Sequence, residues 1–289
     1  MKRGAVIQAM ILSLAVWAGA LTSEQGGQQG QPAAGQAAPS ATPQPAGKRP
    51  PQAKTQPEFD AWKAAAANTD PAALEKAADD FATKFPDSEL RVLLYKNAMR
   101  LYQRTNNAEK TEAMGRKVLS LDADDPEALT TVAEVIAERT HETDIDKDQR
   151  YGEGMKMAEK ALQTVDTDVS VPAGTTQQQL DAYKAGLRSQ AYSTMGTIAY
   201  NQNNFAAAQA NFEKAIDATP NDPYALDVLR LALSLDKQQK YVEALKVANR
   251  AVDMTQDNTP IGTPARHERD RLQQLTGATQ IPQSQPPKN

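Results

Sequence analysis

The sequence contains no cysteine, and this absence excludes several kinds of chemistry at once. It removes disulfide frameworks, thiolate nucleophiles, cysteine-based zinc sites and the lipid-modified cysteine of a mature lipoprotein. The two histidines, His141 and His267, belong to no metal-ligand spacing. The sequence also lacks a phosphate-binding loop, a dinucleotide fingerprint and a nucleophile elbow, so we expect no enzyme activity, no cofactor and no metal. An enzyme whose site carries none of these motifs is the alternative.

Aromatic residues are scarce as well, at 5% of 289 residues, whereas hydrophobic residues make up 40%. A core built mainly from Ala, Leu, Val, Ile and Met favours closely packed helices over a sheet. The formal net charge is -4, without the excess of basic residues that nucleic-acid binding requires. We therefore expect protein or peptide partners and no nucleic acid.

The first twenty residues have the pattern of a secretory signal peptide. Lys2 and Arg3 precede an apolar run over residues 5–21 that ends in small residues, so we predict cleavage after Ala20. The alternative is an uncleaved anchor in the inner membrane, although such a run lies at the short end of what can span a bilayer. In both cases we expect a bacterial protein that is exported to the periplasm or secreted. Membrane contact is expected only if this segment is retained.

Two segments lack the large apolar side chains that a folded core needs. Residues 21–56 are rich in Gln, Pro, Ala and Gly, and residues 277–289 contain three prolines. We predict that both are disordered, because they bury too little apolar surface to offset the entropy of ordering the chain. The folded domain is then predicted to cover residues 57–276.

Within this domain the apolar residues recur with helical periodicity, and turn signals separate them at intervals suited to helical hairpins. The most regular unit covers residues 190–220. Its defining positions are Tyr192, Met195, Gly196, Ala208, Phe212 and Pro220. Gly196 and Ala208 are small where two antiparallel helices approach, and Phe212 fills the wider space beside them. Pro220 ends the second helix, because proline cannot continue it.

These positions resemble the tetratricopeptide pattern of aromatic, leucine and glycine on a first helix, then alanine, phenylalanine and proline on a second. Asn203 and Asn204 are expected to form the turn between the two helices. The resemblance implies an all-α fold, a right-handed α-solenoid of about five helix-turn-helix repeats with a C-terminal capping helix. Ala208 and Ala244 hold equivalent places 36 residues apart, against a family period of about 34. We expect the extra length in the turn at residues 237–240.

Three further hairpins are predicted nearer the N-terminus, over residues 59–85, 95–121 and 129–162. The last one has additional residues, which we expect in a turn at residues 139–151. This turn contains alternating acidic residues at 141–148, and calcium binding there is an alternative to a solvated turn. The helix-loop-helix calcium motif would require Gly and Glu where this chain has Gln149 and Met155.

Two features interrupt the regular array toward the C-terminus. A loop over residues 166–174 precedes an elongated helix that is expected to start near Thr176. Thr263 and Pro264 are expected to begin the capping helix, with proline at its first position. Such a polar helix would shield the last apolar face of the array.

The resemblance implies that partners bind along the concave side, on the outward face of each first helix. By register, the predicted partner-binding residues are Lys96, Arg100, Gln103, Thr130, Glu134, Gln190, Ser193, Thr197, Tyr200, Asn201, Asp227 and Leu231. The alternative for each of them is a merely solvated side chain. Lys96 and Arg100 lie one helical turn apart and are suited to hold a carboxylate, as basic residues of some family members hold a peptide C-terminus.

We therefore expect a non-catalytic protein-interaction scaffold of the cell envelope, which binds a partner peptide or helix in its concave groove. A curved, rigid stack of helices can bind an extended partner with little ordering cost of its own. The alternative is an accessory factor of outer-membrane assembly or cell division that acts through its Pro- and Gln-rich arm.

Overall fold

The computed structural model describes residues 47–172 and 174–277, which form eleven α-helices. The one β-type pairing in this part of the chain is an isolated parallel bridge between Lys48 and Ser170. The predicted all-α solenoid is confirmed. The predicted signal segment, residues 21–46 of the predicted linker and nearly all of the predicted C-terminal tail lie outside the described residues.

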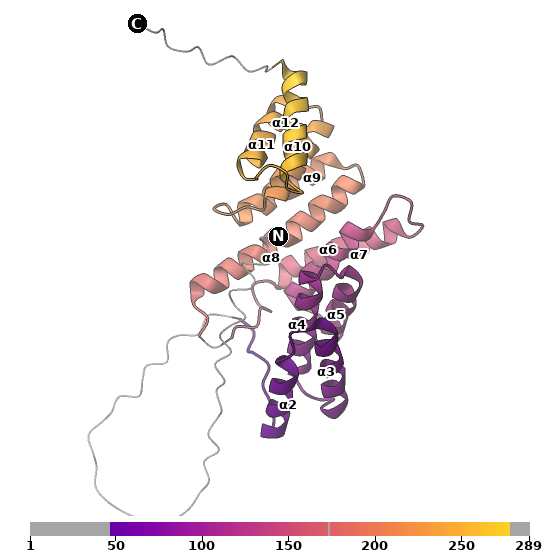
Figure 1. Cartoon of the computed structure of the whole chain (residues 1–289), viewed down its shortest axis with the longest axis vertical. Helices are drawn as coiled ribbons and strands as arrows, with labels where there is room; N and C mark the ends of the chain where they lie inside the picture. The colour runs from indigo at the N-terminus through magenta and orange to yellow at the C-terminus, as the bar shows by residue number, and fades with distance from the viewer. Residues whose placement is uncertain (1–46, 173, 278–289) are drawn as a thin grey trace, which may run out of the picture.

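Five helical hairpins follow one another along an elongated array within the described chain (Figure 1). The first helices of the hairpins are α2 (Gln56–Ala66), α4 (Arg91–Arg104), α6 (Pro126–Arg139), α8 (Gln177–Asn201) and α10 (Ala225–Lys237). The second helices are α3 (Pro71–Lys84), α5 (Ala108–Leu121), α7 (Lys147–Thr164), α9 (Phe205–Ala218) and α11 (Tyr241–Asp253). The last helix, α12 (Gly262–Thr276), packs on α11 as the cap of the array. Every one of these helices is too short or too polar to span a bilayer.

Side chains at the helix starts fix where several helices begin. Six residues accept a hydrogen bond from the backbone N–H three positions later, namely Thr55, Asp70, Asn107, Asp125, Thr176 and Asn204. Such caps satisfy backbone donors that have no partner inside the helix. Thr176 and Gln179 form a reciprocal capping box, which confirms the predicted start of the elongated helix.

Three of the hairpin turns are built alike. Three residues separate α4 from α5, α8 from α9 and α10 from α11, and the middle residue of each is left-handed, with φ of 56°, 60° and 62°. These middle residues are Asn106, Asn203 and Gln239. The turn at 237–240 is therefore no longer than its equivalents, and the expectation that it holds extra length is wrong. The additional residues lie between α9 and α10, at 219–224.

Two other boundaries differ from the predicted ones. The additional residues expected at 139–151 are shared between a connection over 140–146 and α7, which has 18 residues against 14 in α6. Helix α12 begins at Gly262, so Pro264 is its third residue and not its first.

Residues 47–55, which the sequence assigns to the disordered linker, have a defined path beside the array. The Lys48 ammonium lies 2.7 Å from the Asp122 carboxylate at the end of α5, and Arg49 lies 2.6 Å from Glu89 ahead of α4. We call residues 47–55 the N-terminal strap. The sequence conceals it because its contacts are made with residues distant in the chain.

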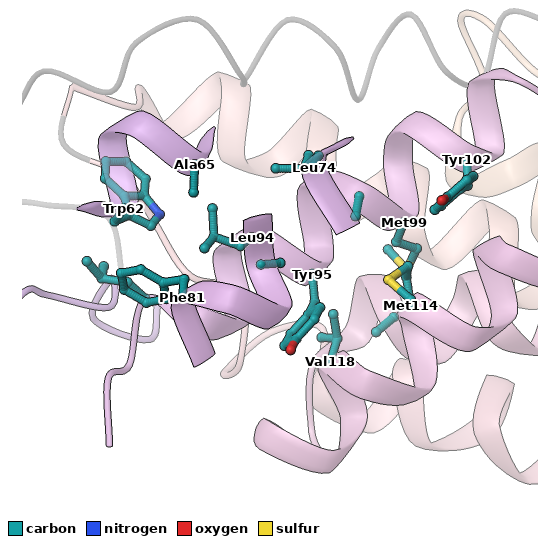
Figure 2. Packing of buried hydrophobic residues seen from close by; sticks show 14 residues of the cluster. Trp62, Ala65, Leu74, Phe81, Leu94, Tyr95, Met99, Tyr102, Met114 and Val118 are labelled. Atoms are coloured by element: carbon teal, nitrogen blue, oxygen red, sulfur yellow. The ribbon is translucent and has the colours of Figure 1, made fainter. Parts of the chain in front are cut away.

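The buried side chains gather mainly in two clusters at the two ends of the array. The first cluster extends from α2 to α6, and Figure 2 shows its members Trp62, Phe81, Leu94 and Met99. The second extends from α8 to α12 around Phe212. Burial of these apolar faces between successive hairpins is the main source of stability in such an array.

The crossing of α8 and α9 depends on a close approach at Gly196. A Cβ atom on this residue would lie 2.7 Å from Cε1 of Phe212, whose side chain is fully buried. The predicted roles of Gly196 and Phe212 are thus confirmed by their packing. Gly186, on the same helix, has no atom within 4 Å of the place that a Cβ would take.

This pair of glycines gives a matched test of the packing. Gly196→Ala should lower stability by about 1 to 3 kcal/mol, because the buried Phe212 ring must shift. Gly186→Ala should raise it by about 0.5 to 1 kcal/mol, because alanine favours a helix without meeting a neighbour. Thermal unfolding followed by circular dichroism measures both. Equal shifts of the two midpoints would contradict this account of the crossing.

Candidate functional site

A pocket of about 110 Å³ opens on the side of the array that the first helices form. Its walls come from α2, α4, α6, α8 and the connection between α7 and α8. Among the side chains that line it are Trp62, Leu93, Asn97, Pro126, Ser170 and Tyr183. The pocket combines apolar walls with a few polar groups, which is the usual composition of a ligand site.

A buried ionic network borders this pocket and ties three first helices together. Arg100 of α4 forms two hydrogen bonds to the carboxylate of Glu127 on α6, at 2.5 and 2.6 Å. The hydroxyl of Tyr183, on α8, donates to the same carboxylate at 2.7 Å. Lys96 lies 2.5 Å from Asp125, the residue that caps α6. Two cations thus face two carboxylates, so the network carries no net charge.

The environment of Glu127 decides its ionisation. Burial by itself would raise the pKa of Glu127, but the charges of Arg100 and Lys96 and the hydrogen bonds from Arg100 and Tyr183 lower it to about 2. Burial would likewise lower the pKa of Lys96, but Asp125 and Glu127 outweigh burial and raise that pKa. Lys96, Arg100 and Glu127 are therefore ionised at neutral pH.

This network corrects one prediction about the site. Lys96 and Arg100 do hold carboxylates, as their spacing suggested, but those carboxylates belong to Asp125 and Glu127 of the same chain. The sequence concealed this pairing because α4 and α6 meet only in the folded array. In this structure the two basic side chains are not free to hold the C-terminal carboxylate of a peptide.

Several other predicted partner-binding residues are used between helices. The Gln190 side-chain amide donates to Glu134 at 2.7 Å, which joins α8 to α6. The Ser193 hydroxyl donates to Asp227 at 2.5 Å, which joins α8 to α10. Gln190, Ser193 and Asp227 are buried, so a partner cannot reach them in this conformation.

The same holds for the small hydroxyl residues and the leucine of the predicted set. Thr197 accepts a hydrogen bond from Arg230 at 3.0 Å, and Thr130 bonds to carbonyl groups of its own helix. Thr130, Thr197 and Leu231 are all buried. Adjacent first helices pack on each other, so some of the residues that we expected on the open face of the groove lie in the contacts between these helices.

The remaining members of the predicted set are accessible but lie apart from the pocket. Gln103 is exposed near the end of α4, and Tyr200 and Asn201 are half-buried at the end of α8. The Tyr200 ring packs edge-on against Phe205, with 5.3 Å between ring centroids. Asn201 donates to the carbonyl of Ala137 at 3.4 Å.

The pocket contains residues that sequence reasoning missed. Asn97 follows Lys96 on α4 and faces the pocket beside it, so a register shifted by one residue would have found it. Trp62 reads in the sequence as a simple core residue. Ser170 gives no local signal, because only the folded connection between α7 and α8 brings it to α4.

The acidic connection after α6 is held by bonds within itself. Asp144 accepts a hydrogen bond from the backbone N–H of His141 at 2.8 Å, and Lys147 pairs with Glu142. Within residues 47–172 and 174–277, the acidic and histidine side chains form no group of three placed to hold a metal ion.

The pKa of Glu127 gives a prediction about pH. Glu127→Gln should lower the free energy of unfolding at neutral pH by about 3 kcal/mol, because Lys96 and Arg100 lose a buried counter-charge. The folded pKa lies below the ordinary value of 4.5. The stabilisation by Glu127 is therefore complete above that value and is lost as the pH falls toward about 2. Urea unfolding of both proteins at several pH values measures this. A difference that stays constant down to about pH 3 would contradict it.

Comparisons with known proteins concern the fold. No family model matches the sequence, and the search of curated proteins finds no match. The structure is similar to YrrB, described as a TPR protein with an unusual peptide-binding site, at 17% identity and a TM-score of 0.44, over 69% of this chain and 85% of that one. It is similar to Acl4, the assembly chaperone of RpL4, at 11% identity and a TM-score of 0.39, over 76% and 98% of the two chains.

A third similar structure is the APC/C hetero-tetramer Cut9–Hcn1, at 11% identity and a TM-score of 0.34, over 76% of this chain and 46% of that one. Likeness at this level says nothing about what this chain binds. Residues 56–276 form a helical-repeat array in which each helix packs mainly on its neighbours in the chain.

Proposed function

We propose that this chain is a non-catalytic protein-interaction scaffold, which binds an extended segment of a partner protein in the pocket between α2, α4, α6, α8 and the α7–α8 connection. The observation that carries the proposal is the pocket itself, which has apolar walls and, at Ser170, a polar residue without a hydrogen-bond partner among the described residues. A polar group without a partner is unfavourable unless a ligand or water satisfies it.

Rigid walls support binding at this pocket. The ionic network around Glu127 fixes α4, α6 and α8 relative to one another. A binding surface that is already ordered loses little conformational entropy when a partner binds. The partner then supplies most of the ordering cost, as an extended segment does when it folds on binding.

We also place this scaffold in the periplasm or cell envelope of a bacterium. This part of the proposal is supported by the signal-peptide pattern over residues 1–21. The Pro- and Gln-rich residues that follow would allow the array to search for partners at some distance from a membrane if the leader is retained.

A pair of substitutions on α4 tests the location of the partner site. Asn97→Arg should fill the pocket and lower partner affinity by at least about tenfold, since a long side chain would occupy the space of the ligand. Gln103→Arg adds the same charge to the same helix at an exposed position outside the pocket, and it should leave affinity unchanged. Isothermal titration with peptides selected from a random library on the full chain measures both. Equal affinity of the two variants would place the partner site elsewhere.

The export proposal has its own test. Expression of the full chain in a Gram-negative bacterium should give a periplasmic protein whose N-terminal residue is Leu21, because the leader is removed after Ala20. Intact-mass measurement of the fractionated protein identifies the terminus. A membrane-bound protein of full mass would indicate the anchor, and a full-length protein in the cytosol would overturn export.

A further inference from the structure

The connection between α7 and α8 forms one wall of the pocket through a short extended segment. Its backbone pairs with the N-terminal strap, since Lys48 N–H donates to the Val169 carbonyl at 3.0 Å and Val171 N–H donates to the Lys48 carbonyl at 3.3 Å. In an extended chain, successive residues direct their N–H and C=O groups to opposite sides. Ser170, between these two valines, therefore turns its N–H and C=O away from the strap.

Ser170 is half-buried, lines the pocket and makes no hydrogen bond within the described residues. Val169 and Val171 are buried against Leu180 and Tyr183 of α8, so the segment is held from its other face. One residue of a free strand edge is thus presented to the pocket. An unpaired strand edge is a template for another extended chain.

The wall formed by α4 offers a hydrogen-bond donor of the same neutral kind. The indole N–H of Trp62 is not such a donor, because it is buried and lies on the side of the ring turned toward Leu94 of α4 (Figure 2). Asn97, also on α4, makes one long contact through its side-chain oxygen and none through its amide nitrogen within the described chain. A main-chain carbonyl group is the acceptor that suits such donors.

The charges around the pocket favour a neutral ligand group. Lys96 and Arg100 are neutralised by Asp125 and Glu127 of this chain, so the pocket offers no uncompensated cation to a peptide carboxylate. A peptide main chain needs neutral donors and acceptors, and these are what Ser170 and Asn97 present.

The strap keeps the free edge in place. A Cβ atom on Gly47 would lie 2.4 Å from Cγ2 of Val171 and 2.8 Å from the Val169 carbonyl oxygen, so the strap and the segment approach as closely as a glycine permits. The Lys48 ammonium also lies 2.7 Å from Asp122. The edge is therefore fixed before a partner arrives, which limits the entropy lost on binding.

We infer that the partner is an extended peptide that adds to the edge at Ser170 as a further strand, and that its main chain also bonds to Asn97. This inference rests on the proposed function and specifies how the partner is held. Recognition through the main chain accepts internal segments of a protein, because it does not require a chain terminus.

The experiment uses the full chain and a peptide selected on it from a random library, synthesised with a free C-terminus and with a C-terminal amide. Ser170→Pro removes the N–H of the free edge. Proline is compatible with an extended Val169 before it, and the lost N–H makes no bond within the described protein. Ser170→Ala is the matched control, because it removes only the hydroxyl.

Ser170→Pro is expected to weaken binding about tenfold, the effect of one lost hydrogen bond. Ser170→Ala and the amidated peptide should bind as the parent pair does. Equal affinity of Ser170→Pro and Ser170→Ala would overturn strand addition, and a large loss on amidation would overturn main-chain recognition. If Asn97→Arg abolishes binding while Ser170→Pro does not, the pocket remains the partner site and strand addition at Ser170 is wrong. If no peptide is selected, both the pocket as partner site and strand addition are wrong.

Discussion

The carboxylate of Glu127 is the interaction on which the arrangement of the pocket depends. It accepts hydrogen bonds from Arg100 of α4 and Tyr183 of α8 while it belongs to α6, so three successive first helices meet at one buried group. A buried ion pair contributes little net stability, but removal of one partner is costly, so such a group favours one relative position of the helices. The same pairing neutralises the basic residues beside the pocket. The Glu127 carboxylate therefore determines both the relative position of the three helices and the preference of the pocket for a neutral ligand group.

Much of the fold could be predicted from the sequence, because its determinants are local or follow a short period. Asn203, Gly196 and Phe212 specify a hairpin within one short stretch, and the structure places them as expected. The site could be predicted only in part. Lys96 was predicted to face a partner on the concave side; it lines the pocket, where it pairs with Asp125 of another repeat. Ser170 could not be predicted, since it reaches the pocket through an irregular connection and a strap that starts far earlier in the chain.

Three departures from a regular array meet at the pocket. The long connection before α8, the elongated first turns of α8 and the N-terminal strap converge beside α2 and α4. Regular repeats would supply only helical walls, whose backbone groups are already bonded. The irregular segment instead adds a backbone edge with an open N–H and C=O. In this account the extra residues between α7 and α8 convert a general helical groove into a site for an extended chain.

The most direct test of the central claim, that an unpaired backbone donor in the pocket bonds to a partner main chain, is the backbone N–H signal of Ser170 in a ¹H–¹⁵N NMR spectrum. Ser170→Pro lacks this N–H, so comparison of its spectrum with that of the parent protein assigns the signal. Titration with the selected, amidated peptide should move this proton downfield and slow its exchange with water, since the donor gains an acceptor. A signal that keeps its position and its exchange rate at saturation would contradict the account.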